Sequence, residues 1–292
     1  MEYGGQIYIS TDSGLTWTPR ESSRAWNSIA ISGDGSKVVA AVSGGQLYLS
    51  ANSGLTWTAR ESPRGWASVA SSSDGTKLAA ASFFDQIYTS GDAGTTWIAR
   101  ETSRLWQAIA SSADGARLVA VESFGQIHVS SDVGVTWTAR ESNRAWTSVA
   151  SSADGARVLA AETGGQLYLS TDFGVTWTAR ESNRSWRSVA SSADGSKLAA
   201  VVNGGQVYLS KDSGVNWIPR ESNRQWSAIT LSGNGTRVVA AETGGRIYVP
   251  LPNAITSGGG FISGGTRSLI ELLCVGNGVF LPTAQQGTLT AQ

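Results

Sequence analysis

Residues 10–17 read STDSGLTW and residues 20–26 read RESSRAW, and this pair of motifs recurs every 40 residues as far as residue 226. The six copies of the first motif begin at residues 10, 50, 90, 130, 170 and 210, and all 12 tryptophans lie in the two motifs. A fixed period of this length with strand-like content is typical of a β-propeller or a related solenoid. Because every repeat carries the same chemistry, the pattern favours repeated binding sites over a single catalytic pocket.

The composition indicates a compact, turn-rich chain without charge bias. Of 292 residues, 40% are hydrophobic, 15% are charged and 35 are glycine, which fits one large all-β domain. The 22 basic and 22 acidic residues cancel, which argues against a nucleic-acid partner or an anionic membrane surface. No stretch reaches the roughly 20 apolar residues of a membrane-spanning helix. The lone Cys274 excludes an internal disulfide, and one methionine and one histidine leave little for a metal site, so no cofactor is expected.

Residues 146–180 show how one repeat divides into four strands. Short β-branched, apolar or alternating runs are separated by Gly- and Asp-containing turns at 152–155, 164–165 and 171–174. We label the predicted strands A to D, and they are Trp146–Ala150, Val158–Ala161, Gln166–Ser170 and Val175–Ala179. Four strands in about 35 residues predict a propeller blade. In such a blade the A–B and C–D turns share one face, and the B–C loop and the D–A connection share the other.

The S-x-D-x-G-x-T-W motif resembles the Asp-box of sialidases, sortilin-type receptors and secreted bacterial propellers. The resemblance covers residues 1–250, and Asn52 replaces the aspartate in one copy. It implies a structural C–D turn on the face away from an active site: the carboxylate accepts backbone N–H groups of its own turn, and the tryptophan packs between blades. The residues concerned are Asp12, Asp92, Asp132, Asp172 and Asp212 with Trp17, Trp57, Trp97, Trp137, Trp177 and Trp217.

Sialidase activity does not follow from this resemblance. The family carries a Phe/Tyr-Arg-Ile-Pro segment, and the nearest sequence here is Ile218-Pro219-Arg220. The arginines recur in register in every repeat, whereas a catalytic site needs different residues from different blades, and no unique carboxylate pair for glycoside hydrolysis is evident. We therefore expect that the protein is not an enzyme.

The R-E-S-x-R-x-W motif places a second set of residues on the B–C/D–A face. Guanidinium, carboxylate and indole groups together suit the binding of sugar hydroxyls or acidic sugars. The alternative is structural: Arg and Glu pair across blades, and the tryptophan packs into the core. This candidate ring consists of Arg24, Arg64, Arg144, Arg184 and Arg224 with Trp26, Trp66, Trp146, Trp186 and Trp226.

Departures from the repeat indicate a more specific candidate site. The B–C loops of two successive repeats read SFFD at 82–85 and ESFG at 122–125, where other copies carry Gly-Gly. Aromatic side chains beside arginine predict an interaction patch, although they could instead cap the blade ends or plug the central channel. The patch would comprise Phe83, Phe84, Asp85, Glu122 and Phe124 with Arg100, Arg104 and Trp106 of the connection between the two loops. His128, which replaces a tyrosine, is interpreted as a packing variant.

Strand counting bears on how the ring closes. Strands A, B and D each occur six times, but strand C occurs seven times, first at Gln6–Ser10. The spacing of Leu269–Val275, Val279–Ala284 and Gln286–Thr290 echoes that of a repeat, so residues 251–292 are predicted to supply a degenerate seventh blade that pairs with the N-terminal strands. The alternative is a six-bladed ring of residues 1–250 followed by a separate attachment or assembly module.

These observations together predict a non-catalytic, multivalent propeller that binds extracellular glycans or surface proteins. The second hypothesis is a structural or assembly module of a bacterial surface or virion-like structure, or a duplicated or designed scaffold, which self-associates through the C-terminal tail. Met1–Gln6 shows no signal-peptide features, so an extracellular or cell-surface location is expected from the resemblance alone.

Overall fold

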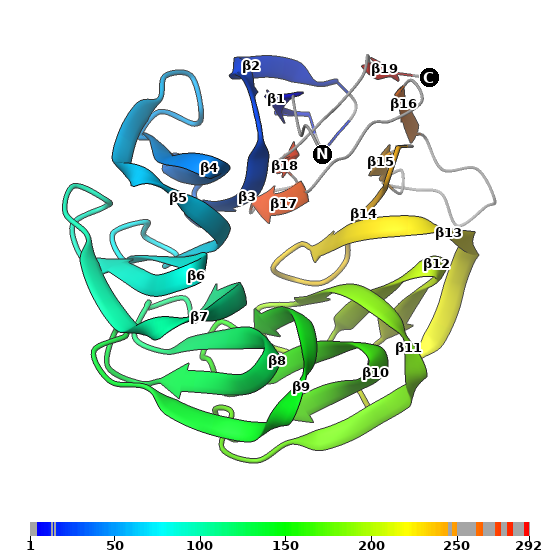
Figure 1. The fold of residues 1–292 in the computed structure, drawn as a ribbon. Coiled ribbons are helices and arrows are strands. Elements are labelled where there is room, and N and C mark those ends of the chain that lie inside the picture. Colours follow the sequence, from blue (N-terminus) through cyan, green and yellow to red (C-terminus); the bar gives the residue numbers. More distant parts are fainter. Residues whose placement is uncertain are drawn as a thin grey trace.

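The protein folds into a ring of β-sheets around a central axis (Figure 1). The structure is a computed structural model and describes residues 5–12, 14, 16–244, 247–249, 261–264, 272–275, 279–282 and 289–291. Within these residues every regular element is a β-strand. In the same ranges, no helix is long and apolar enough to cross a membrane.

The strands of the repeats are long and nearly equal in length. Their bounds are β1 (Gly5–Ile9), β2 (Thr18–Arg24), β3 (Trp26–Ile31), β4 (Val38–Ser50), β5 (Thr58–Ser71), β6 (Leu78–Ser90), β7 (Ile98–Ser111), β8 (Leu118–Ser130), β9 (Thr138–Ser151), β10 (Val158–Ser170), β11 (Thr178–Ser191), β12 (Leu198–Ser210), β13 (Ile218–Leu231), β14 (Val238–Glu242) and β15 (Ile247–Tyr248). The tail adds β16 (Phe261–Gly264), β17 (Leu272–Val275), β18 (Val279–Pro282) and β19 (Leu289–Ala291).

Each long strand serves two predicted strands. β5 begins as strand D of one blade, where Arg60 pairs with Leu47 of β4, and ends as strand A of the next blade, where Ala70 pairs with Ala79 of β6. β4 likewise contains strand B in its first half and strand C in its second half. The R-E-S-x-R segments, which were predicted to lie in the D–A connections, are therefore parts of continuous strands that run from the rim of one blade to the axis of the next.

A left-handed glutamate bends each D–A strand. The glutamates of the R-E-S-x-R motif have φ between 52° and 60°, in the region that L-residues rarely adopt. In the first blade, the Gln46 side-chain amide donates to the Glu61 carbonyl at 2.9 Å, and the corresponding bond recurs from Gln6 to Gln206. The glutamine of strand C thus satisfies the backbone acceptor that the bend exposes.

The hydrophobic core lies between blades, with one tryptophan at the centre of each junction. Trp66 is fully buried among Ala41 and Leu47 of one blade and Val69 and Leu78 of the next. The aromatic ring of the facing strand C meets each tryptophan edge-on, with ring centroids 4.9–5.3 Å apart. Truncation of a buried tryptophan to alanine costs about 3–5 kcal/mol, so these side chains dominate the cohesion of the ring.

Backbone hydrogen bonds also join the A–B turns around the axis. Each turn donates to the equivalent residue 40 positions later at 2.7 Å, in the series Gly33 to Ser73, Ser73 to Ala113, Ala113 to Ala153, Ala153 to Ala193 and Ala193 to Gly233. Because every bond joins the same atoms of successive repeats, the series sets the same spacing between neighbouring blades.

The N-terminal hairpin closes the ring. Ile7 and Ile9 of β1 pack with Trp26 of the first complete repeat, whereas Trp17, at the end of the same hairpin, packs with Ile247 of the last repeat. β17 lies beside β3 and β13 near the axis, and β18 lies beside β1 (Figure 1). β17 and β18 form one antiparallel pair and β1 and β2 another, and the two pairs lie side by side in the places of strands A–B and C–D of a seventh blade. The predicted seven-bladed propeller, closed by N- and C-terminal strands in one blade, is confirmed.

The rest of the tail departs from the prediction. β16 pairs with β15 and completes the sixth blade, and β19 pairs with β16 as a further outer strand of that blade. Leu289–Ala291 therefore does not supply a strand C for the seventh blade, because β1 already occupies that place. Residues 269–271, 276–278 and 283–288 of the predicted blade lie outside the described residues.

We expect truncation after Gly264 to lower the thermal unfolding midpoint more than truncation after Pro282. The first variant removes β17 and β18, which lie beside β1, β3 and β13, whereas the second removes only β19 at the rim of the sixth blade. Differential scanning calorimetry of the three chains would measure the effect. Equal midpoints for the two truncations would contradict the assignment of β17 and β18 to the closing blade.

Candidate functional site

The two ends of the blades form chemically different faces. On one face, which we call the turn face, the C–D turn donates to the A–B turn of its own blade, as in Ser53 N–H to the Ser36 carbonyl at 2.8 Å. The opposite face, which we call the loop face, carries the B–C loops and the R-E-S-x-R segments. There the Ser43 N–H donates to the Ala25 carbonyl at 2.8 Å.

The aspartates of the first motif are bound within their own turns on the turn face. Asp92 accepts from the Ser90 hydroxyl at 2.8 Å, from the Thr96 N–H at 2.9 Å and from the Thr96 hydroxyl at 2.6 Å. The Trp97 indole N–H donates to the Gly94 carbonyl at 3.1 Å. The same arrangement occurs around Asp12, Asp132, Asp172 and Asp212, with Trp17, Trp137, Trp177 and Trp217. In the copy with Asn52, the amide oxygen still accepts from the Thr56 N–H, and the Trp57 indole still donates to the Gly54 carbonyl. These carboxylates thus form their hydrogen bonds with groups of their own turn.

The tryptophans of the candidate ring do not face solvent. Trp26, Trp66, Trp106, Trp146, Trp186 and Trp226 are each at most 1% exposed. None can present its indole face to a sugar, because each fills a junction between blades. This corrects the assignment of Trp106 and its equivalents as candidate ligand-binding residues.

The arginines of the ring are engaged with neighbouring side chains. Their guanidinium groups lie 4.4–4.7 Å from the ring centroid of a strand C tyrosine, for Arg24, Arg64, Arg144, Arg184 and Arg224. Arg144 pairs with Glu141 of its own segment and with Glu162 of the B–C loop, both at 3.5 Å. Arg104, Arg144 and Arg224 thus do pair across blades, but with the B–C-loop glutamate of the next blade. The glutamates of the motif pair instead with the arginine three residues later, as in Glu21 with Arg24 and Glu141 with Arg144.

The two phenylalanine-bearing loops differ from the rest of the loop face. Phe84 and Phe124 are each 74% exposed and have φ of 62° and 60°. The equivalent positions of other repeats carry glycine with positive φ, at Gly44, Gly164, Gly204 and Gly244. Phe83 is half-buried and meets the Phe84 ring edge-on at 4.5 Å. Phe84 and Phe124 therefore neither plug the channel nor cover a blade end.

Arg104 connects these two loops. Its backbone pairs with Asp85 of the second blade, and its guanidinium lies 3.4 Å from Glu122 of the third blade. Asp85 in turn accepts from Arg64 at 2.8 Å. The structure thus brings Phe83, Phe84, Asp85, Arg104, Glu122 and Phe124 to one region, which we call the Phe patch. Arg100 lies outside it, because its Nε donates to Thr89 at 3.1 Å toward the turn face.

His128 lies beneath the Phe patch. It is 2% exposed, packs edge-on against Trp106 and lies 3.6 Å from Glu122, too far for a hydrogen bond. Nε2 has no hydrogen-bond partner among the described residues. Burial, and secondarily the charge of Arg104, lowers the pKa of His128, although Glu122 acts in the opposite direction.

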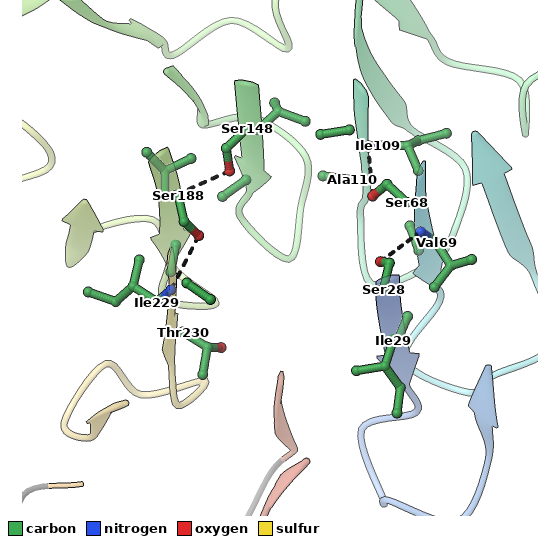
Figure 2. A pocket seen from close by; sticks show the side chains of 18 of the residues that line it. Ser28, Ile29, Ser68, Val69, Ile109, Ala110, Ser148, Ser188, Ile229 and Thr230 are labelled. Carbon is green, nitrogen blue, oxygen red and sulfur yellow. Dashed lines mark hydrogen bonds between the residues drawn. The ribbon is translucent and has the colours of Figure 1, made fainter. Parts of the chain in front are cut away.

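The axial channel was not predicted as a site. It encloses about 450 Å³ between the innermost strands of six blades, and serine hydroxyls such as Ser28 and Ser68 accept from the next blade's Val69 and Ile109 backbones (Figure 2). The residue that follows each buried tryptophan lines the end of the channel nearest the loop face. This residue differs in every repeat: it is Asn27, Ala67, Gln107, Thr147, Arg187 or Ser227. This variability inside near-identical repeats was the signal that could have found it.

Within the described ranges, no three His, Cys, Asp or Glu side chains group closely enough to hold a metal ion. The Phe patch presents exposed apolar rings and paired charges.

Comparison with known proteins establishes the fold. No protein-family model and no curated protein matches the sequence. The structure is similar to that of YCF48 from Cyanidioschyzon merolae, with a TM-score of 0.68 and 14% identity over 96% of this chain and 98% of that chain. It is also similar to the β-propeller domain of Myceliophteria thermophila Cps50 (Swd1), with a TM-score of 0.68 and 12% identity over 90% and 97% of the two chains. Such identities show a shared propeller architecture alone.

The prediction that the protein is not an enzyme requires correction. The chain is similar to an ancestral GH74 enzyme, with a TM-score of 0.65 and 15% identity over 98% of this chain and 46% of that chain. The same architecture thus forms part of an enzyme. Arginines in register and a missing sialidase signature do not exclude catalysis, because other reactions can use other residues of the fold.

We expect H128Y to raise the free energy of unfolding by about 1 kcal/mol at neutral pH. A tyrosine would place its ring under Arg104, as in the other repeats, and would remove a buried imidazole nitrogen without a partner. Because the folded pKa of His128 is lowered, the unfolded chain takes up a proton first, and stability is lost as the pH falls below about 6.5.

Urea unfolding at about pH 7.5 and about pH 5.5 would measure both effects. The pH-dependent loss should be smaller in H128Y than in the wild type. An unchanged difference between the two pH values would show that His128 does not cause it.

We expect the double variant D132N/D172N to be less stable than the wild type at neutral pH, by a difference that shrinks as the pH falls from about 4 toward 2. Hydrogen bonds from the adjacent threonines lower the pKa of both aspartates to about 2. Their stabilisation is therefore present above the unfolded pKa of about 3.8 and is lost as the pH falls toward 2. Unfolding curves over this range would measure it, and a difference independent of pH would contradict it.

Proposed function

We propose that this propeller is a binding module that takes a protein partner on its loop face, with Phe84 and Phe124 as the anchoring side chains. Among structures of the same fold, YCF48 bound to a D1 peptide matches with a TM-score of 0.65 and 14% identity, over 90% of this chain and 92% of that chain. That structure is a precedent for peptide binding by a propeller. The residues of the present chain carry the proposal itself.

The single observation that carries it is the backbone conformation of the two exposed phenylalanines. A non-glycine residue in the left-handed region costs about 1–3 kcal/mol, and other repeats avoid this cost with glycine. Both rings remain 74% exposed, so their own fold does not compensate for the cost by burial. A contact with another molecule would do so, because burial of a phenylalanine contributes about 1.5–3 kcal/mol.

The surroundings of the two rings fit an interface with a protein. Protein interfaces are enriched in aromatic anchors surrounded by charged groups that keep access to solvent. Arg64, Asp85, Arg104 and Glu122 form such a frame, and their side chains are 18–35% exposed. Because these charges pair with one another, a bound partner would not need to neutralise an isolated charge.

The proposal places binding at the Phe patch alone, whereas the sequence analysis predicted a ring of repeated binding sites. The ring arginines are stacked and ion-paired, which leaves them less suited to hold six separate ligands. Glycan binding, the Asp-box relationship, an extracellular location and self-association through the tail remain predictions from the sequence.

The test uses the double variant F84G/F124G, which restores the glycine of the other repeats. We expect it to unfold at the same temperature as the wild type or higher, because backbone strain is relieved and little burial is lost. Peptides would be selected on the wild-type chain by phage display and their affinities measured by isothermal titration calorimetry. We expect affinity for the selected peptides to fall at least about tenfold in the double variant, as for loss of two anchoring side chains.

F173A serves as the matched control. Phe173 is also left-handed and 41% exposed, but it lies on the turn face. F173A should bind the same peptides as the wild type. Peptides that bind F84G/F124G equally well would refute the proposed site, and a glycan array with hits beside an empty peptide selection would favour the glycan alternative.

A further inference from the structure

A groove opens between the first and second complete repeats, near the turn face and away from the Phe patch. It encloses about 360 Å³ between β4, β5 and β6 and the turn that follows β6. Apolar side chains such as Leu49 and Leu78 form one part of its lining, and Asn52, Lys37 and Arg60 contribute polar groups. Among the described residues that line it, two are cations and none carries a carboxylate.

Arg60 lacks an acceptor in this groove. Its Nε is buried without a hydrogen-bond partner among the described residues, and Nη1 has only the Ala59 carbonyl at 3.4 Å. The equivalent Arg20, Arg140 and Arg180 also have an Nε without a partner among the described residues, whereas Arg100 Nε donates to the Thr89 hydroxyl at 3.1 Å. Leu49 stands in the position of that threonine here. An unpaired buried donor is costly, so an acceptor supplied from outside would stabilise this arrangement.

The local charge favours an anion as that acceptor. Asn52 is the one copy of the first motif without a carboxylate, and it keeps the turn through bonds to Ser50 and Thr56. The Asp-to-Asn change therefore removes a negative charge from the groove lining without loss of the turn. Lys37 adds a second cation: its ammonium donates to the Asp74 carbonyl at 2.9 Å, and its charge also acts on the Asp74 carboxylate, which does not line the groove.

The equivalent groove between the third and fourth complete repeats shows how a larger side chain narrows such a space. Phe173 lines it, and the Arg117 guanidinium lies 3.5 Å from the Phe173 ring centroid. That cavity is smaller, about 250 Å³, although Arg140 in the position of Arg60 also has an unpaired Nε. Ala93 replaces Phe173 in the first groove and leaves it open.

We propose that the open groove binds a small organic carboxylate. The carboxylate would accept hydrogen bonds from Arg60 and pair with Lys37, and its apolar body would contact Leu49 and Leu78. The volume lies in the range of small-ligand sites, and an apolar wall with a few convergent polar groups is their usual composition. This site is independent of the proposed function, because it lies away from the Phe patch.

Benzoate is the probe for this proposal. Saturable binding to the full chain would be measured by ligand-observed NMR, with benzyl alcohol as the neutral counterpart. We expect the wild type to bind benzoate with an affinity at least about tenfold higher than its affinity for benzyl alcohol. This is the difference that one charge-assisted hydrogen bond contributes. A93F, which introduces the larger side chain, and R60M, which removes the donor, should each lower benzoate affinity at least about tenfold.

R140M is the matched control, because it removes the equivalent arginine from the groove that Phe173 narrows. Benzoate should bind R140M and the wild type equally. Thermal unfolding of each variant would confirm that it is folded. Absence of saturable benzoate binding to the wild type, equal binding to A93F, or equal loss in R140M and R60M would overturn the proposal.

Discussion

Burial of one tryptophan at each junction between blades is the interaction on which the rest of the structure depends. Trp66 and its equivalents each contact strands of two neighbouring blades, so no blade completes its core alone. The edge-on tyrosine and the arginine stacked above it belong to the same unit. The R-E-S-x-R-x-W motif is thus largely committed to holding the ring together, and repetition follows because each junction must solve the same packing problem.

Function in such a chain is expected where a repeat departs from its neighbours at a position that the fold does not need. Phe84 and Phe124 meet this criterion, since glycine serves the same backbone conformation elsewhere. Asn52 meets it on the other side of the blades, where it removes a negative charge from the lining of a groove. His128 is different: it replaces tyrosine inside a junction, where we expect it to affect the stability of the fold and the pH dependence of that stability.

Shared architecture does not decide what the propeller does. Structures of this fold include a peptide complex and part of a GH74 enzyme, at identities of 14% and 15%. The arginines that recur in register in every repeat belong to the scaffold, so their regularity does not exclude catalysis. Catalytic groups can be added at individual loops of the same scaffold.

The sequence by itself determined the all-β class, the four strands of each blade, the two chemically distinct faces and the seventh strand C that favoured seven blades over six. These follow from local rules of period, turn chemistry and strand alternation, which act within a repeat. Only the tertiary structure decided whether a side chain shared by all repeats is exposed or buried. It placed Trp106 in a junction, Arg100 outside the Phe patch and β19 on the sixth blade. Such outcomes depend on contacts with a neighbouring blade, about 40 residues away or at the other end of the chain, which no local pattern records.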